Sequence, residues 1–174
     1  GRSLRAMLSS TFADELLARY RGESKVFAVS IKDRGAIPPA GQGGKAFWFS
    51  KAAGEFVTSD YYYDRYPQWV SDWNESGKVD GYANRSWELL RSPASYRYLD
   101  MDDSPWETDF PGYGRTFPHP WGDRTGKYFT TLLTVSPAGD ELTLDFAKRL
   151  VEAEGLGQDE VPDYLSVSFS STDY

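Results

Sequence analysis

Apolar residues recur along the first part of the chain in a pattern that predicts a helix followed by a strand. Thr11 can cap a helix together with Asp14, and apolar residues then recur at helical spacing until Gly22 ends the helix. Residues 25–31 are apolar at nearly every position, as in a strand that is covered on both faces. This order of helix, short loop and buried strand indicates an α/β protein.

The last part of the chain repeats this order. Ser136 and Pro137 begin a predicted helix, whose apolar residues follow at intervals of four until Gly155 ends it. Residues 164–169 predict a second strand, apolar on one face and lined with small serines that permit a helix to approach on the other. Because a helix precedes each strand, we expect the strands to be parallel and their carboxyl ends to share one edge.

The segment between the two strands predicts less regular structure. Residues 35–44 contain two Pro and four Gly, which predicts a loop. Residues 46–58 read as a β-hairpin, and residues 67–74 as a short helix. Residues 77–126 have no clear period but are rich in aromatic residues, which indicates an ordered, irregular excursion rather than a disordered one.

Composition and charge narrow the class of protein. The 174 residues are 40% hydrophobic and 26% charged, enough for a single domain with a substantial core. A net charge of −7 argues against broad nucleic-acid binding, and no apolar run approaches the roughly 20 residues of a membrane span. There is no Cys, so cysteine usage does not indicate whether the protein works in an oxidising or a reducing compartment. The chain opens on Gly1 without an initiator Met, and we expect it to be a piece of a longer protein.

Charged residues follow both predicted strands. Lys32 and Arg34 come after the first strand, and Asp173 comes after the second. If the carboxyl ends share one edge, two cations and a carboxylate meet where open α/β sheets bind ligands. This combination suits a phosphate held next to a metal ion.

Several stretches together resemble the alkaline phosphatase superfamily. The resemblance covers almost the whole chain and is nearest to the bacterial branch of monomeric, phosphate-irrepressible enzymes with a Thr nucleophile, relatives of the type I phosphodiesterases and nucleotide pyrophosphatases. The stretches that carry it are KVFAVSIKDRGAI, AFWFS, GEFVTSDYY, YPQWVSDWN, TFPHP, SPAGDELTLDFAKRLVEAEGLG and PDYLSVSFSSTDY.

The resemblance implies a fold and a division of the chain. The expected fold is α/β, part of an alkaline-phosphatase-like parallel sheet flanked by helices. An irregular, aromatic-rich inserted cap containing the β-hairpin is expected at residues 45–126. Residues 1–174 would then be a single fragment, the central section of one domain. An exposed sheet edge, where strands of the parent are missing, is expected to favour self-association.

The resemblance also implies site residues and a reaction. Lys32 and Arg34 match the family's residues that contact the non-bridging oxygens of the phosphoryl group, a pair that diesterase relatives generally lack. Asp173 matches a ligand of one of two Zn²⁺ ions. The implied parent hydrolyses phosphate monoesters through a phosphothreonine intermediate, in the periplasm or outside the cell. Its nucleophile and remaining metal ligands fall outside this chain, which is therefore expected to be inactive alone.

Each candidate residue also has a plainer interpretation. Taken without the resemblance, Lys32 and Arg34 can be solvated charges after a strand, and Asp173 a turn residue. His119, between two prolines, matches no metal ligand of the family and reads as structural. The acidic cluster Asp100–Asp103 lacks the spacing of a Ca²⁺ loop.

Two further alternatives concern Asp33 and the aromatic residues. Asp33 reads as structural, orienting Arg34 or capping a turn. The run Tyr61–Tyr63 with Trp69 and Trp73 reads either as the core of the cap or as the lining of a substrate entrance.

Three functions remain open from the sequence. The first is the central section of a zinc-dependent phosphomonoesterase, and the second is a phosphodiesterase or nucleotide pyrophosphatase of the same superfamily. The third is a non-catalytic module whose aromatic-rich surface binds a ligand.

Overall fold

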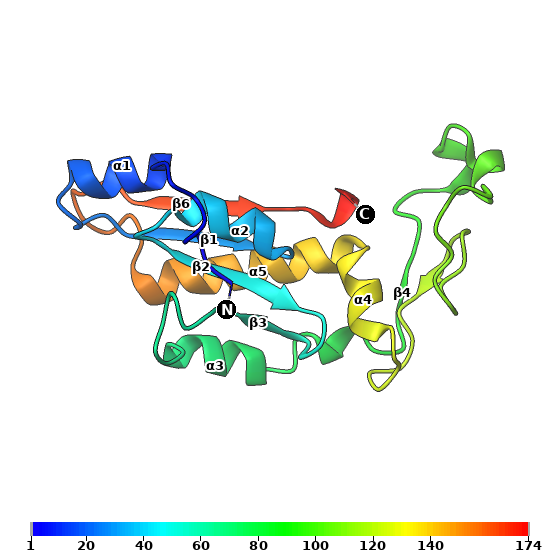
Figure 1. Cartoon of the computed structure of the whole chain (residues 1–174). Coiled ribbons are helices and arrows are strands. Elements are labelled where there is room, and N and C mark those ends of the chain that lie inside the picture. The colour runs from blue at the N-terminus through cyan, green and yellow to red at the C-terminus, as the bar shows by residue number, and fades with distance from the viewer. Residues whose placement is uncertain (1, 174) are drawn as a thin grey trace.

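A four-stranded sheet in the order β3-β2-β1-β6 organises the chain (Figure 1). In this computed structural model, which describes residues 2–173, β1 (Val26–Ser30) is central and pairs in parallel with β2 (Lys45–Ser50) and β6 (Tyr164–Ser168). β3 (Glu55–Val57) pairs antiparallel with β2 and forms the predicted hairpin. The α/β fold class and the parallel pairing of the two predicted strands are confirmed.

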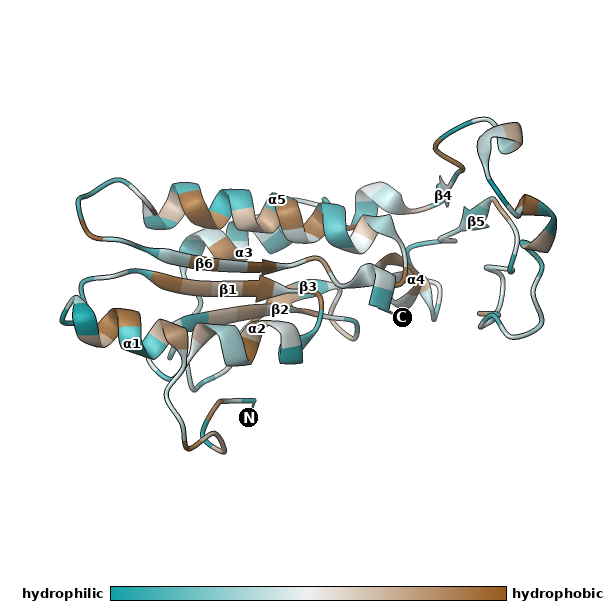
Figure 2. Ribbon diagram, turned by 90° about the horizontal axis from the view of Figure 1, so that it is seen from above, coloured by the Kyte–Doolittle hydropathy of each residue, from teal (hydrophilic) through white to brown (hydrophobic). Residues whose placement is uncertain are grey.

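Helices cover both faces of this sheet, as Figure 2 shows. α5 (Pro137–Glu154), α3 (Gln68–Glu75) and α4 (Phe129–Thr134) lie on one face, and α2 (Asp33–Ala40) lies on the other. α1 (Phe12–Arg19) packs beside α2 and begins with the capping box that its sequence predicts. Since alternate residues of β1 contact opposite layers, all five of its residues are buried, which explains why the four residues before Ser30 are all apolar.

None of the helices in the described part of the chain combines the length and apolar character needed to cross a membrane.

Aromatic side chains fill the layer between the sheet and α5. Phe146 of α5 is fully buried and stacks on Phe56 with ring centroids 4.3 Å apart, and Phe47, Trp69 and Trp73 surround it at 5.1–5.4 Å. Such pairs stabilise a core beyond their buried area by about 0.5–1.5 kcal/mol each. Trp69 and Trp73 are therefore core residues, and the core to which they belong lies between the main sheet and α5.

The ends of the two indole rings are anchored by carboxylates of the same helix. Trp69 Nε1 donates to Glu154 at 2.7 Å, and Trp73 Nε1 donates to Asp145 at 2.7 Å. Tyr62 is also buried, on the opposite face of the sheet. These contacts fit a packing role for both Trp residues, because each indole N–H donates to a carboxylate of the helix against which its ring packs.

The prediction of a loop over residues 35–44 is wrong in its first half. α2 runs to Ala40 and includes Pro38 and Pro39 in its last turn. A short helix tolerates them because they remove few internal hydrogen bonds, while Ala36 and Ile37 are buried against the sheet. Tertiary packing thus outweighs the low helix propensity of the segment.

An irregular arm projects from the body between α3 and α4 (Figure 1). It confirms the predicted absence of regular structure, since only a two-residue antiparallel pair and three short 3₁₀ turns interrupt it. These elements are η1 (Asp80–Tyr82), β4 (Ser86–Trp87), η2 (Pro93–Ser95), η3 (Leu99–Met101) and β5 (His119–Pro120). Within residues 45–126, β2 and β3 belong to the main sheet; the assignment of that whole range as an inserted cap stays a prediction.

His119 and the acidic cluster of the arm have local partners. The His119 ring is buried, stacks on Tyr113 at 4.6 Å, and has its Nδ1 atom 3.3 Å from the Tyr113 carbonyl oxygen. Asp103 accepts a hydrogen bond from Arg115 at 2.8 Å. Both contacts hold the irregular chain together, which fits the structural interpretation of these residues.

One long edge of the main sheet has no partner strand. β6 is the last strand in the order of the sheet, and each of its residues is half-buried, whereas β1 is wholly buried. Among the described residues, no strand pairs with its outer side. Self-association through this edge stays a prediction.

The aromatic core generates a stability prediction. Phe146→Ala should lower the free energy of unfolding by about 3–5 kcal/mol, because the cavity would lie among four large aromatic neighbours. Urea denaturation measures this change. Lys148→Ala, an exposed position on the same helix, is the control and should change stability by about 0.5 kcal/mol or less. Similar losses in the two variants would contradict the assigned core.

Candidate functional site

The end of β1 passes directly into the first turn of α2. Ile31 and Lys32 link the two elements, Lys32 occupies the N-cap position, and Asp33 and Arg34 open the helix. The Lys32 side chain is only 4% exposed, so its aliphatic stem packs in the protein while its ammonium group reaches the sheet edge.

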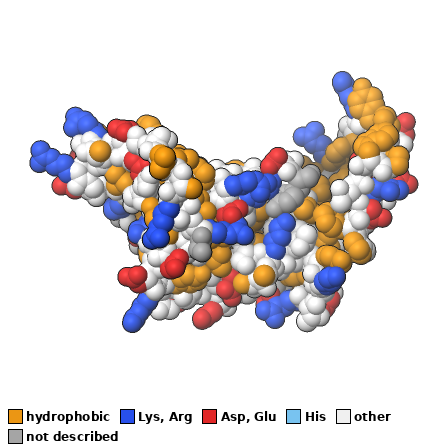
Figure 3. Space-filling view, viewed as in Figure 1, with side chains coloured by type: hydrophobic (Ala, Val, Ile, Leu, Met, Phe, Trp, Pro, Cys, Tyr) orange, Lys and Arg blue, Asp and Glu red, His pale blue; other side chains and the backbone are white. Residues whose placement is uncertain are grey.

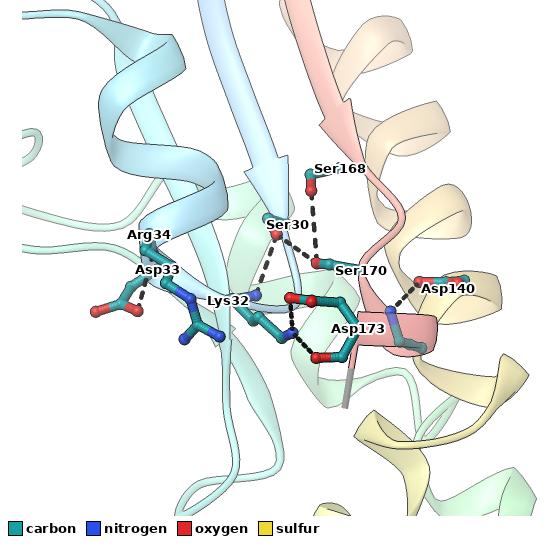
Figure 4. Close-up of polar contacts among 9 residues, drawn as sticks. Ser30, Lys32, Asp33, Arg34, Asp140, Ser168, Ser170 and Asp173 are labelled. Carbon is teal, nitrogen blue, oxygen red and sulfur yellow. Dashed lines mark hydrogen bonds and ion pairs between the residues drawn. The ribbon is translucent and has the colours of Figure 1, made fainter.

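Lys32 meets Asp173 at this edge. The Lys32 Nζ atom lies 2.6 Å from Asp173 Oδ2 and 3.0 Å from the Asp173 carbonyl oxygen, as Figure 4 shows. Asp173 lies in the short turn η4 (Ser171–Asp173), which follows β6. The parallel strands therefore bring together two residues that are 141 positions apart, as their sequence pattern predicts.

Lys32 favours the ionised form of the Asp173 carboxyl group. The hydrogen bond and the positive charge of Lys32, with a smaller contribution from Arg34, lower the pKa of the Asp173 carboxyl. Its side chain is 74% exposed, so solvent screens the attraction and the ion pair adds little to stability. The carboxylate is thus charged at neutral pH and accessible from outside.

Arg34 lies beside this pair on the first turn of α2. Its side chain is exposed and its guanidinium group extends toward Lys32 and Asp173 (Figure 4). Within residues 2–173 this guanidinium group makes no hydrogen bond or ion pair. Asp33 accepts a hydrogen bond from the Arg34 backbone N–H at 2.9 Å and pairs with Arg2, which agrees with a structural role for Asp33.

The cationic groups open onto a cleft of about 690 Å³ between the start of α2 and the β2–β3 hairpin. Figure 3 shows Lys and Arg side chains gathered in the hollow between the body and the arm. The charged residues that line the cleft are Arg2, Lys32, Asp33, Arg34, Lys51 and Asp60. Four cations against two carboxylates make this an attractive place for an anion in a protein of net charge −7.

Sequence reasoning missed Arg2 and Lys51 as members of this cleft. Lys51 directly follows β2, whose carboxyl end lies at the same edge as that of β1. The sequence signal is a third charged strand end, which the interpretation of residues 46–58 as a hairpin does not by itself reveal. For Arg2, near the start of the chain, no sequence signal pointed to the cleft.

The residues of this chain do not assemble the two-zinc site that the resemblance implies. No group of three or more His, Cys, Asp and Glu side chains that could hold a metal ion occurs in residues 2–173. Asp173 offers one carboxylate, which Lys32 engages. Any metal site that includes Asp173 needs ligands from elsewhere.

The sequence of the chain is similar to those of several known proteins. No protein-family model matches the chain. It is 39% identical over 172 residues to a protein of Myroides odoratus named calcium-transporting ATPase. It is 38% identical over 170 residues to alkaline phosphatase PhoV of Synechococcus elongatus, and 34% identical over 175 residues to alkaline phosphatase PafA of Elizabethkingia meningoseptica. These matches take in 97–99% of the chain.

The fold agrees with the same relatives. The crystal structure of wild-type PafA matches with a TM-score of 0.86 at 34% identity, over 99% of this chain and 34% of PafA. A PafA variant with Ser in place of a Thr, and with an Asn, a Lys and an Arg changed to Ala, matches with a TM-score of 0.88. The chain spans about a third of the length of the curated relatives it matches. It is therefore homologous, over almost all its residues, to a section of the PafA- and PhoV-type alkaline phosphatases.

Proposed function

We propose that this chain supplies the phosphate-binding part of the active site of an alkaline phosphatase that hydrolyses phosphate monoesters. The observation that carries the proposal is the meeting of Lys32, Arg34 and Asp173 at one edge of a parallel sheet. Phosphoryl binding is assigned to the two cations. Asp173 is assigned to a metal site of the whole enzyme, whose further ligands come from outside residues 2–173. The resemblance to the family implies that this metal is Zn²⁺.

The chemistry of the two cations fits a phosphate monoester. A monoester carries one more negative charge than a diester, so it gains more from each cation near its oxygens. The Arg34 guanidinium group offers planar paired donors, and the Lys32 ammonium group offers a compact charge held in place by its buried stem. These groups would hold phosphoryl oxygens while charge develops on them in the transition state.

The comparison with PafA adds independent support. In the PafA variant of known structure, the substituted Lys and Arg lie two positions apart, as Lys32 and Arg34 do. The name calcium-transporting ATPase belongs to one relative, whereas PafA and PhoV are named alkaline phosphatases and PafA also shares the fold at a TM-score of 0.86. A periplasmic or secreted location is part of the proposal and rests on the family alone.

One prediction of this function concerns the protein in which residues 1–174 are joined to the rest of their enzyme. Lys32→Ala and Arg34→Ala should each lower kcat/KM for a phosphate monoester by about 10- to 100-fold, since a charged hydrogen bond contributes about 1.5–3 kcal/mol. Hydrolysis of a matched diester with the same leaving group should fall much less. Steady-state kinetics on the two esters gives the ratio.

Arg19→Ala is the matched control, because Arg19 is an exposed cation in the last turn of α1, away from the cleft. It should leave both rates unchanged. Equal losses on the two esters in the Lys32 and Arg34 variants would reject phosphoryl binding by these side chains. A wild-type enzyme that prefers the diester would instead favour a phosphodiesterase or nucleotide pyrophosphatase.

Another prediction of this function concerns the 174-residue chain alone. It should not hydrolyse a chromogenic phosphate monoester even with added Zn²⁺, because residues 2–173 hold no cluster of ligands for a metal ion. The assay is release of the chromophore, with an intact alkaline phosphatase as the positive control. Zinc-dependent turnover that disappears in Asp173→Ala would show that the chain builds its own centre, against this proposal.

A further inference from the structure

Three serine hydroxyl groups lie at the carboxyl ends of β1 and β6, next to the segments that carry Lys32 and Asp173. Ser30 is the last residue of β1 and is fully buried, and Ser168, the last residue of β6, is its partner across the sheet. Ser170 follows two positions later. Its Oγ atom is 3.2 Å from Ser30 Oγ and 3.5 Å from Ser168 Oγ (Figure 4).

This serine cluster, Ser30, Ser168 and Ser170, is tied to both charged segments. Ser30 Oγ accepts a hydrogen bond from the backbone N–H of Lys32 at 3.1 Å. Ser170 directly precedes the η4 turn that carries Asp173. The backbone pairing of β1 with β6 ends at Ser30 and Ser168. Beyond these residues, the contact between the Ser30 and Ser170 hydroxyl groups links the two segments.

The first turn of α2 rests directly on the same cluster. A Cβ atom on Gly35 would lie 2.5 Å from Ser30 Oγ, which is too short unless something moves, and 3.2 Å from Ser168 Oγ, which is a tight contact. The absence of a side chain at Gly35 lets the helix start against the hydroxyl groups. Arg34 precedes Gly35 in this turn, so the close contact of Gly35 also keeps Arg34 near the end of β1.

The opposite side of the η4 turn is held by α5. Asp140, in the first turn of α5, accepts a hydrogen bond from the Ser171 backbone N–H at 3.2 Å. Ser171 is 5% exposed and packs over Gly139, where a Cβ atom would lie 2.6 Å from its Oγ atom. The η4 turn thus contacts α5 on one side, and Ser170, which precedes it, contacts Ser30 on the other.

We propose that Ser30 is a positioning residue, whose hydroxyl group sets the placement of Lys32 relative to Asp173 in the phosphate-binding site. The inference rests on the proposed function and extends it to a residue that would not itself touch the substrate. Without the hydroxyl group, the buried Lys32 N–H loses its acceptor and Ser170 loses its link to β1.

The test uses the complete enzyme with Ser30→Ala, Ser170→Ala and the double variant. Each single variant should lower the monoester-to-diester ratio of kcat/KM by about 3- to 10-fold, the size expected for one hydrogen bond. The double variant should lose little more than either single variant, because both remove the same contact. Ser170→Thr, which keeps a hydroxyl group at a half-buried position, should restore the ratio.

Ser166→Ala is the matched control. Ser166 lies on the same face of β6, one alternate position before Ser168, and pairs with Ala28 rather than with the end of β1. It should leave the ratio unchanged. A general loss of folded enzyme lowers both rates together and leaves the ratio untouched, so the ratio separates positioning from stability.

Amide hydrogen exchange gives a readout that is independent of activity. Ser30→Ala should speed exchange at the Lys32 N–H relative to that at Ala28, in the middle of the same strand, whereas Ser166→Ala should change neither. Unchanged relative exchange at Lys32, or an unchanged ester ratio in Ser30→Ala, would overturn the inference.

The Lys32→Ala and Arg34→Ala variants distinguish this failure from failure of the proposed function. If those two variants change the ester ratio while Ser30→Ala does not, the inference alone is rejected. If they leave the ratio unchanged, the proposed function is rejected and the inference falls with it.

Discussion

The parallel pairing of β1 with β6 is the constraint on which the candidate site depends. It aligns Ser30 with Ser168, although most of the chain lies between them. Because both strands run in the same direction, the residues that leave them emerge at one edge, and Lys32 there contacts Asp173 at 2.6 Å. An antiparallel arrangement of the same two strands would place these charges at opposite ends of the sheet.

The two faces of the sheet support this edge in different ways. One face carries the aromatic layer around Phe146, which fixes α5 and, through its first turn, the chain that leaves β6. On the other face, the small residues Ala28 and Ala46 pack against α2, and Gly35 lets its first turn approach the end of β1 closely. The aromatic packing on the α5 face and the close approach of α2 on the other face together determine where the charged groups lie.

The electrostatics of the site oppose those of the whole chain. Against a net charge of −7, the cleft beside α2 gathers Arg2, Lys32, Arg34 and Lys51. A local excess of cations attracts an anionic ester without giving the protein a general affinity for polyanions. In the proposed function this section of the enzyme binds the phosphoryl group, while the bond-breaking groups belong to other sections. The homology to about a third of PafA and PhoV is consistent with that division.

The sequence alone determined the α/β class, the buried strand at residues 25–31, the helix that ends at Gly155, and the charged groups after both strands, because each depends on local periodicity and end signals. It did not reveal α2, since two Pro and a Gly argue against a helix until Ala36 and Ile37 are buried against the sheet. Nor did it reveal Lys51 in the cleft or the serine cluster under Lys32. These features depend on which strands become neighbours, and only long-range packing decides that.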